Sequence, residues 1–193
     1  RSPDGEMIEV YDVARSCPTG PFFLDRSVEA FEEQITEYGV DGIYINGLGG
    51  RCHCDRCKAR FERETGLKWP EHFDHTDPNF GDWVEWGYRM VTELTRRQYE
   101  GVKRVDPDVP YFIDTAGLQW YEWIQSSAQD MGEQARYQDL VSTEVFNDVA
   151  RLYTGYLGPV VARYVRSTAE ASLRPPAVFV SSFPGHSWPD SNQ

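Results

Sequence analysis

Apolar residues recur at helical spacing in several segments of the chain, and short, nearly continuous apolar runs lie between these segments. The segment 28–38 is typical: its apolar positions repeat at helical spacing, Asp25 or Ser27 stands where a capping side chain is expected, and Gly39 follows. The predicted helices cover 28–38, 58–65, 82–105, 120–128 and 159–168. The predicted strands cover 40–46, 109–114, 140–144 and 177–183.

Helices and strands alternate along the chain. The strands are short and almost entirely apolar, which is typical of parallel strands that are covered by helices on both faces, so the sequence predicts an α/β fold. A complete (β/α)8 barrel takes about 250 residues, so a chain of 193 residues would form only part of one. We therefore interpret 1–193 as a single catalytic-type α/β barrel domain that lacks its N-terminal βα units, in agreement with a start at Arg1 rather than at a methionine.

The composition is that of a folded domain with an acidic surface. Hydrophobic residues make up 40% of the chain and aromatic residues 14%, which is enough for one sizeable core. The formal net charge of -12 argues against partners that need a basic surface, such as nucleic acid or an anionic membrane, and favours neutral substrates. No apolar run approaches the roughly 18 residues of a membrane span.

Three of the four cysteines, Cys52, Cys54 and Cys57, lie together on a glycine-rich segment that leads into a predicted helix. Thiols at this spacing do not pair easily with one another, and only Cys17 remains as a distant partner, so the pattern favours a metal over a disulfide framework. Zinc prefers soft ligands in a tetrahedron, and a site filled by four of them is structural. Two alternatives stay open: a site that uses His53 in place of Cys17, and thiols without a metal. Zinc-type cysteines, and the lack of a visible leader segment, favour a cytoplasmic location.

Cys17, the helix that follows it, a strand ending in Asn46 and the Cys-x-Cys-x-x-Cys motif at 52–57 together resemble the zinc site of the glycoside hydrolase family 42 β-galactosidases. The segments 38–44 and 61–70 look still more like uncharacterised "hypothetical glycosyl hydrolase" barrels related to that family and to α-L-fucosidases. The resemblance implies a (β/α)8 TIM-type barrel, an activity on carbohydrate and a structural zinc ion. The ligands that it implies are Cys17, Cys52, Cys54 and Cys57.

The chain departs from the resemblance at one position that matters for chemistry. In family 42 the strand before the cysteine motif ends in Asn-Glu, and the glutamate is the acid/base, whereas this chain has Asn46-Gly47. Fucosidase-like relatives place an aspartate nucleophile at the end of this strand. An amide donates a hydrogen bond to a sugar hydroxyl but does not ionise, so Asn46 is assigned to substrate binding.

The catalytic candidates lie at strand ends, because side chains at the C-terminal ends of barrel strands converge on one site. The predicted strands end in Asn46, Asp114 and Glu144. Glycoside hydrolysis needs two carboxyl groups, about 5–5.5 Å apart for retention and about 6.5–9.5 Å apart for inversion. Glu144 is the preferred proton donor or nucleophile, and Asp114 is its partner. The alternative for each is a carboxylate that caps a helix or pairs with an arginine.

Aromatic residues and a histidine are found in or near the loops that follow strands. Flat rings suit the apolar face of a sugar, and a loop histidine can bind a hydroxyl group, although core packing and ordinary loop hydrogen bonds are the alternatives. The candidates for substrate binding are Trp120, Trp123, His186 and Trp188. Trp83 and Trp86 fall on the apolar stripe of a helix and are assigned to the core.

The sequence supports three functional hypotheses. The first is hydrolysis of a glycosidic bond by Glu144 together with Asp114 or with a carboxylate outside this chain. The second is a catalytically degenerate carbohydrate-binding barrel, because Asn46 replaces the expected carboxylate. The third is a hydrolase-like domain that acts in assembly. The expected partners are a carbohydrate ligand and further copies of the chain in a homo-oligomer. An open barrel fragment would also expose strand edges, so we expect poor behaviour of the chain in isolation.

Overall fold

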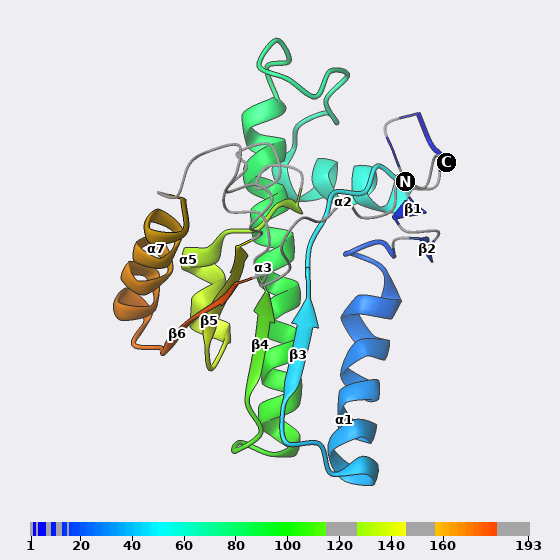
Figure 1. Ribbon diagram of the computed structural model, residues 1–193. Coiled ribbons are helices and arrows are strands. Elements are labelled where there is room, and N and C mark those ends of the chain that lie inside the picture. Colours follow the sequence, from blue (N-terminus) through cyan, green and yellow to red (C-terminus); the bar gives the residue numbers. More distant parts are fainter. Residues whose placement is uncertain are drawn as a thin grey trace, which may run out of the picture.

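The computed structural model describes residues 2, 4–6, 9–10, 13–14, 16–114, 127–145 and 157–180. In this part of the chain, four parallel strands form a sheet in the order β3-β4-β5-β6. A short antiparallel pair, β1 with β2, lies near the start of the chain. The long helix α3 runs behind β3 and β4, and α1 lies beside them (Figure 1). The parallel α/β fold predicted from the sequence is therefore confirmed.

The elements have the following bounds. The strands are β1 Glu9–Val10, β2 Val13–Ala14, β3 Ile43–Asn46, β4 Tyr111–Asp114, β5 Val141–Val145 and β6 Pro176–Val180. The helices are α1 Ser27–Tyr38, α2 Asp55–Thr65, α3 Phe80–Val105, α5 Met131–Gln134 and α7 Leu157–Ser172, with a π-helical turn at Phe22–Arg26 and a 3-10 turn at Ala135–Tyr137. Among the helices that the structure describes, none is long and apolar enough to cross a membrane.

Most of the predicted elements are present with shifted ends. The helix predicted over 58–65 begins three residues earlier and ends at 65 as predicted, as α2, whereas the helix predicted over 159–168 extends further at both ends, as α7. Gly39 and Gly66 adopt left-handed backbone angles directly after α1 and α2, which is the conformation expected at helix ends. Most of the helix predicted over 120–128 lies outside the described residues. So does the end of the strand predicted over 177–183.

The expected capping of the first helix is wrong. Asp25 and Ser27 do not cap it, because a π-helical turn runs directly into α1 and leaves no free helix start at that point. Ser27 serves the core instead: its hydroxyl donates to the carbonyl oxygen of Phe23 at 2.6 Å and accepts from Gln98 Nε2 at 2.8 Å. Gln98 in turn accepts from the Tyr111 hydroxyl at 2.8 Å, so one buried amide joins α1, α3 and β4.

Breaking this buried hydrogen-bond chain should destabilise the fold. Gln98 is 1% exposed and Tyr111 is 0% exposed. Gln98→Leu therefore removes the hydrogen-bond partner that the hydroxyls of Tyr111 and Ser27 share, at a position that water does not reach. We expect the free energy of unfolding to fall by about 2–3 kcal/mol, measured by urea denaturation. Adding Tyr111→Phe should recover part of that loss in a double-mutant cycle, and strictly additive losses would contradict the network.

The two faces of the sheet differ. Ile43, Tyr111 and Ile113 pack against α1 and α3 in the largest apolar cluster of the described residues. Because successive side chains of a strand alternate, Tyr44 and Phe112 lie on the opposite face, with ring centroids 5.2 Å apart, and Tyr44 is 43% exposed. In a closed barrel this second face is the interior.

Candidate metal centre and strand-end site

The four cysteines meet although they come from three parts of the chain. Cys17 precedes the π-helical turn, Cys52 and Cys54 belong to the loop after β3, and Cys57 lies in the first turn of α2. All four Sγ atoms lie within 4.8 Å of one another. The Sγ of Cys17 is 3.7 Å from that of Cys54 and 3.4 Å from that of Cys57.

These distances match a metal tetrahedron better than disulfides. Zinc bound to sulfur at about 2.3 Å places the sulfurs of a tetrahedron about 3.8 Å apart, whereas a disulfide needs about 2.05 Å. All four cysteines are free thiols, and the quartet forms one mutually close set rather than two pairs. Cys17 completes the set, as the sequence predicted.

Hydrogen bonds among the thiols shift the pKa values of Cys52 and Cys57 in opposite directions. The pKa of Cys52 is lowered because the thiols of Cys17 and Cys57 donate to its sulfur. The pKa of Cys57 is raised by its hydrogen bonds with Cys17 and Cys52 and by burial. All four thiols would lose their protons on binding a metal ion, because cysteine binds zinc as the thiolate and the cation compensates the charge.

His53 points away from the cysteines. Its ring lies 4.3 Å from that of Phe73, 5.7 Å from Trp69 and 5.6 Å from Trp83, measured between centroids, and the residue is 8% exposed. Burial lowers the pKa of His53 to about 4, so the ring is neutral near pH 7. The alternative in which His53 replaces Cys17 as a ligand is not supported, because His53 belongs to the aromatic cluster under the loop.

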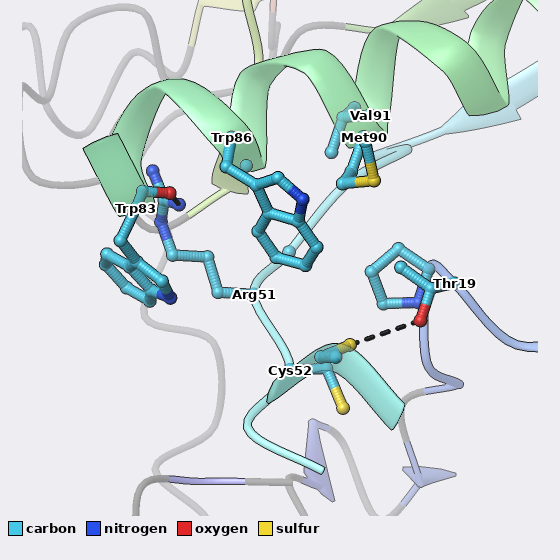
Figure 2. A pocket seen from close by; sticks show the side chains of 11 residues that line it. Thr19, Arg51, Cys52, Trp83, Trp86, Met90 and Val91 are labelled. Atoms are coloured by element: carbon cyan, nitrogen blue, oxygen red, sulfur yellow. Dashed lines mark hydrogen bonds between the residues drawn. The ribbon is translucent and has the colours of Figure 1, made fainter. Parts of the chain in front are cut away.

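Trp83 and Trp86 lie in the core beside the cysteines, 5% and 4% exposed, as predicted. Between them and the loop lies Arg51, whose guanidinium group sits 4.2 Å from the ring centroid of Trp83 (Figure 2). It donates to the carbonyl oxygens of Trp83 at 3.2 Å and Val84 at 3.3 Å. Burial lowers the pKa of Arg51 to about 10, which leaves it charged near neutral pH. Arg51 therefore links the loop that carries Cys52 and Cys54 to α3.

The loop between β3 and the cysteines is also held from the side of β4. The backbone N–H of Gly50 donates to the carbonyl oxygen of Ser127 at 2.6 Å, and Gln129 Nε2 donates to that of Leu48 at 2.5 Å. Gly49 has a φ of +144° and lies so close to Ser127 that a Cβ atom would be 2.4 Å from its carbonyl oxygen. Only glycine fits here.

Substitution within this loop should separate conformational strain from steric clash. Gly47→Ala introduces a side chain at a φ of +68° into open space, whereas Gly49→Ala also forces the loop away from the backbone of Ser127. We expect Gly47→Ala to lower the free energy of unfolding by about 1–2 kcal/mol and Gly49→Ala by about 2–4 kcal/mol more. Thermal unfolding of the two variants checks this, and equal losses would contradict the close approach.

Three polar residues stand side by side at the C-terminal end of the sheet. Asn46 pairs in register with Asp114, and Asp114 pairs with Ser142. Asp114 is 0% exposed, whereas Asn46 is exposed. Ser142, which sequence reasoning missed, donates to the carbonyl oxygen of Ile113 at 2.9 Å. Glu144 lies two residues further along β5, on the same face, and its side chain is outside the described part of the structure.

The other candidates for substrate binding come from the loops that follow the strands. They lie outside the described residues: Trp120, Trp123, His186 and Trp188. Of the strand-end candidates, the structure brings together Asn46 and Asp114 and puts Glu144 on the neighbouring strand. Thr19 and Arg51 were also missed, because a lone threonine or arginine has no sequence signal for a contact with a distant segment.

The fold is that of part of a TIM-type barrel of the kind found in glycoside hydrolases. Among solved structures, the β-galactosidase from Rahnella sp. R3 matches with a TM-score of 0.52 and 17% identity, over 68% of this chain and 23% of that one. A catalytic mutant of a GH42 β-galactosidase from G. stearothermophilus matches with a TM-score of 0.55 and 14% identity, over 70% and 26%. An agarase matches with a TM-score of 0.50 and 15% identity, over 87% and 34%.

These likenesses establish the fold, and they show how much of each solved structure the chain covers. The chain spans only about a quarter to a third of the length of these structures, with shares of 23%, 26% and 34%. A scan against models of protein families and a search of the curated proteins gave no match. The prediction that this is a partial barrel resembling the family 42 enzymes is confirmed.

Proposed function

We propose that this chain is part of a barrel that acts on a carbohydrate and hydrolyses a glycosidic bond. The observation that carries the proposal is the polar row at the C-terminal end of the sheet, where Asn46 and Asp114 are in register and Glu144 follows on the next strand. The C-terminal ends of the strands are where barrel enzymes place their chemistry. The solved structures of similar fold are β-galactosidases and an agarase, which supports a sugar as the substrate class.

The register gives Asp114 and Glu144 a spacing suited to a carboxylate pair. Asp114 is opposite Ser142, and Glu144 lies two residues beyond it on the same face. With strands about 4.8 Å apart and a rise of about 3.3 Å per residue, their Cα atoms are about 8 Å apart. A Cα separation of this size is compatible with the carboxyl separations used for both retention and inversion. We assign Glu144 as proton donor or nucleophile and Asp114 as its partner.

Asn46 favours a second candidate function. Its exposed amide stands in the register position next to Asp114, where an ionisable group would serve catalysis and an amide can only hydrogen-bond. A barrel that binds sugar without cleaving it would keep such a residue. A panel of glycosides with different sugars and linkages separates the two: turnover supports hydrolysis, whereas heat of binding in calorimetry without turnover supports the binding barrel.

We further propose that the cysteine quartet holds one zinc ion in a structural role. Four thiolates are the soft ligand set that zinc prefers, and four protein ligands leave no open position for a substrate or water. The ion would tie the segment before α1 to the loop after β3 and to the start of α2. It would thereby fix the loop that leads away from Asn46.

A further inference from the structure

Thr19 touches two of the four cysteines. Its hydroxyl oxygen lies 3.2 Å from the Sγ of Cys57 and 3.3 Å from the Sγ of Cys17, and the first contact is the dashed line in Figure 2. Thr19 is 5% exposed. It sits in a tight turn in which the N–H of Gly20 donates to the carbonyl oxygen of Cys17 at 2.9 Å, so its position relative to Cys17 is fixed by the backbone.

The chemistry of the bound state decides what the hydroxyl does. Metal-bound cysteines are thiolates, which only accept hydrogen bonds, so the single hydroxyl proton of Thr19 must be donated to one of the two sulfurs. The Thr19 hydroxyl oxygen lies 3.2 Å from the Sγ of Cys57 and 3.3 Å from that of Cys17, and Cys57 is the more deeply buried of the two cysteines. A buried thiolate gains most from a donor because water does not reach it, so we assign the hydroxyl proton to Cys57.

We propose that Thr19 is a positioning residue of the metal centre, which donates its hydroxyl hydrogen bond to the sulfur of Cys57 and thereby raises metal affinity. This inference rests on the proposed zinc site. A divalent cation with four thiolates carries a net negative charge, and in a buried site each donor to sulfur stabilises that charge. Groups that orient metal ligands in this way typically contribute 10–100-fold to affinity.

The side chain suits this role in shape as well. A β-branched residue has few χ1 rotamers, so the hydroxyl stays directed at the sulfurs. The rest of Thr19 lines a small apolar pocket with Trp86, Met90 and Val91 (Figure 2). A valine has nearly the same shape and would fill that space, so Thr19→Val removes the hydrogen bond with little change in packing.

Zinc affinity, measured by competition with a chromophoric chelator under reducing conditions, tests the inference. Thr19→Val should bind zinc about 10–100-fold more weakly than wild type. Thr19→Ser, which keeps the hydroxyl, should stay within a few-fold. Thr36→Val is the matched control, because Thr36 is exposed on α1 and its hydroxyl donates to the carbonyl oxygen of Glu32 at 2.9 Å.

A second measurement uses cobalt in place of zinc. Loss of the hydrogen bond makes the sulfur a stronger electron donor, so the sulfur-to-cobalt charge-transfer band of Thr19→Val should move to lower energy at saturating cobalt. Wild-type zinc affinity in Thr19→Val together with an unmoved cobalt band would overturn the inference. A tenfold loss of zinc affinity in Thr19→Ser would also overturn it. The Thr19→Ser result tests the inference even if Thr19→Val fails to fold. A wild-type chain that binds neither metal would instead overturn the proposed zinc site.

Discussion

Replacing Cys57 with serine is expected to abolish stable zinc binding and to lower the melting temperature markedly. Cys57 is 1% exposed and is the member of the cysteine quartet that lies on α2, and its Sγ lies 3.4 Å from that of Cys17. A serine hydroxyl stays protonated near neutral pH and is a poor ligand for zinc beside three thiolates. Zinc content after dialysis, by elemental analysis, should fall from about one per chain to near zero.

The loss of stability follows from the linkage between binding and folding. A ligand present at about 1,000 times its Kd stabilises the folded state by about 4 kcal/mol. For a domain of this size that corresponds to a fall in Tm of about 8–16 °C. Chelator-treated wild type should melt at nearly the same temperature as Cys57→Ser.

Arg63→Ser is the control for this experiment, because it makes a serine on the same helix at a side chain that is 68% exposed. It should keep its zinc and most of its melting temperature. A Cys57→Ser protein that retains one zinc per chain would show that the ligand set differs from the four cysteines.

Replacing Glu144 with glutamine is expected to lower glycoside turnover by about 10²–10⁴-fold, the range that a positioned acid or base contributes. The amide has nearly the shape of the carboxylate but neither ionises nor donates a proton to a leaving group. Because the change leaves the polar row of Asn46 and Asp114 intact, sugar binding measured by calorimetry should remain.

Glu133→Gln is the matched control for Glu144→Gln. Glu133 lies on α5 with a side chain that is 52% exposed and a 3.4 Å ion pair with Arg136, so its neutralisation should leave turnover unchanged. Equal turnover by wild type and Glu144→Gln would refute the assignment of Glu144 while leaving the barrel intact. Turnover by neither, together with sugar binding by both, would favour the binding barrel.

Apolar patterns were sufficient to predict α1, α2, α3 and the parallel strands, because these elements bury apolar side chains in a continuous core. The π-helical turn and α5 were missed. Each spans only about one helical turn, too short for a repeating apolar stripe. Ser27 looked like a cap because serine often is one, but a buried amide from α3 competes for its hydroxyl.

The cysteine quartet also combines features that the sequence reveals with contacts that it does not reveal. Cysteine spacing predicted the group of Cys52, Cys54 and Cys57, and the resemblance to the family 42 zinc site implied Cys17 as the fourth member. The hydroxyl of Thr19 and the cation of Arg51 depend on contacts between distant segments, and Arg51 reaches α3 only because Gly87 has no side chain there. At the strand ends, the sequence indicated Asn46 and Asp114, and only the register shows that they are neighbours.

The most direct test of the metal centre is the metal content of the purified protein combined with X-ray absorption at the zinc edge. Four sulfur ligands at about 2.3 Å and one zinc per chain are the expected result. Protein prepared without chelator that contains no zinc, or zinc with nitrogen or oxygen among its ligands, would contradict the four-cysteine site.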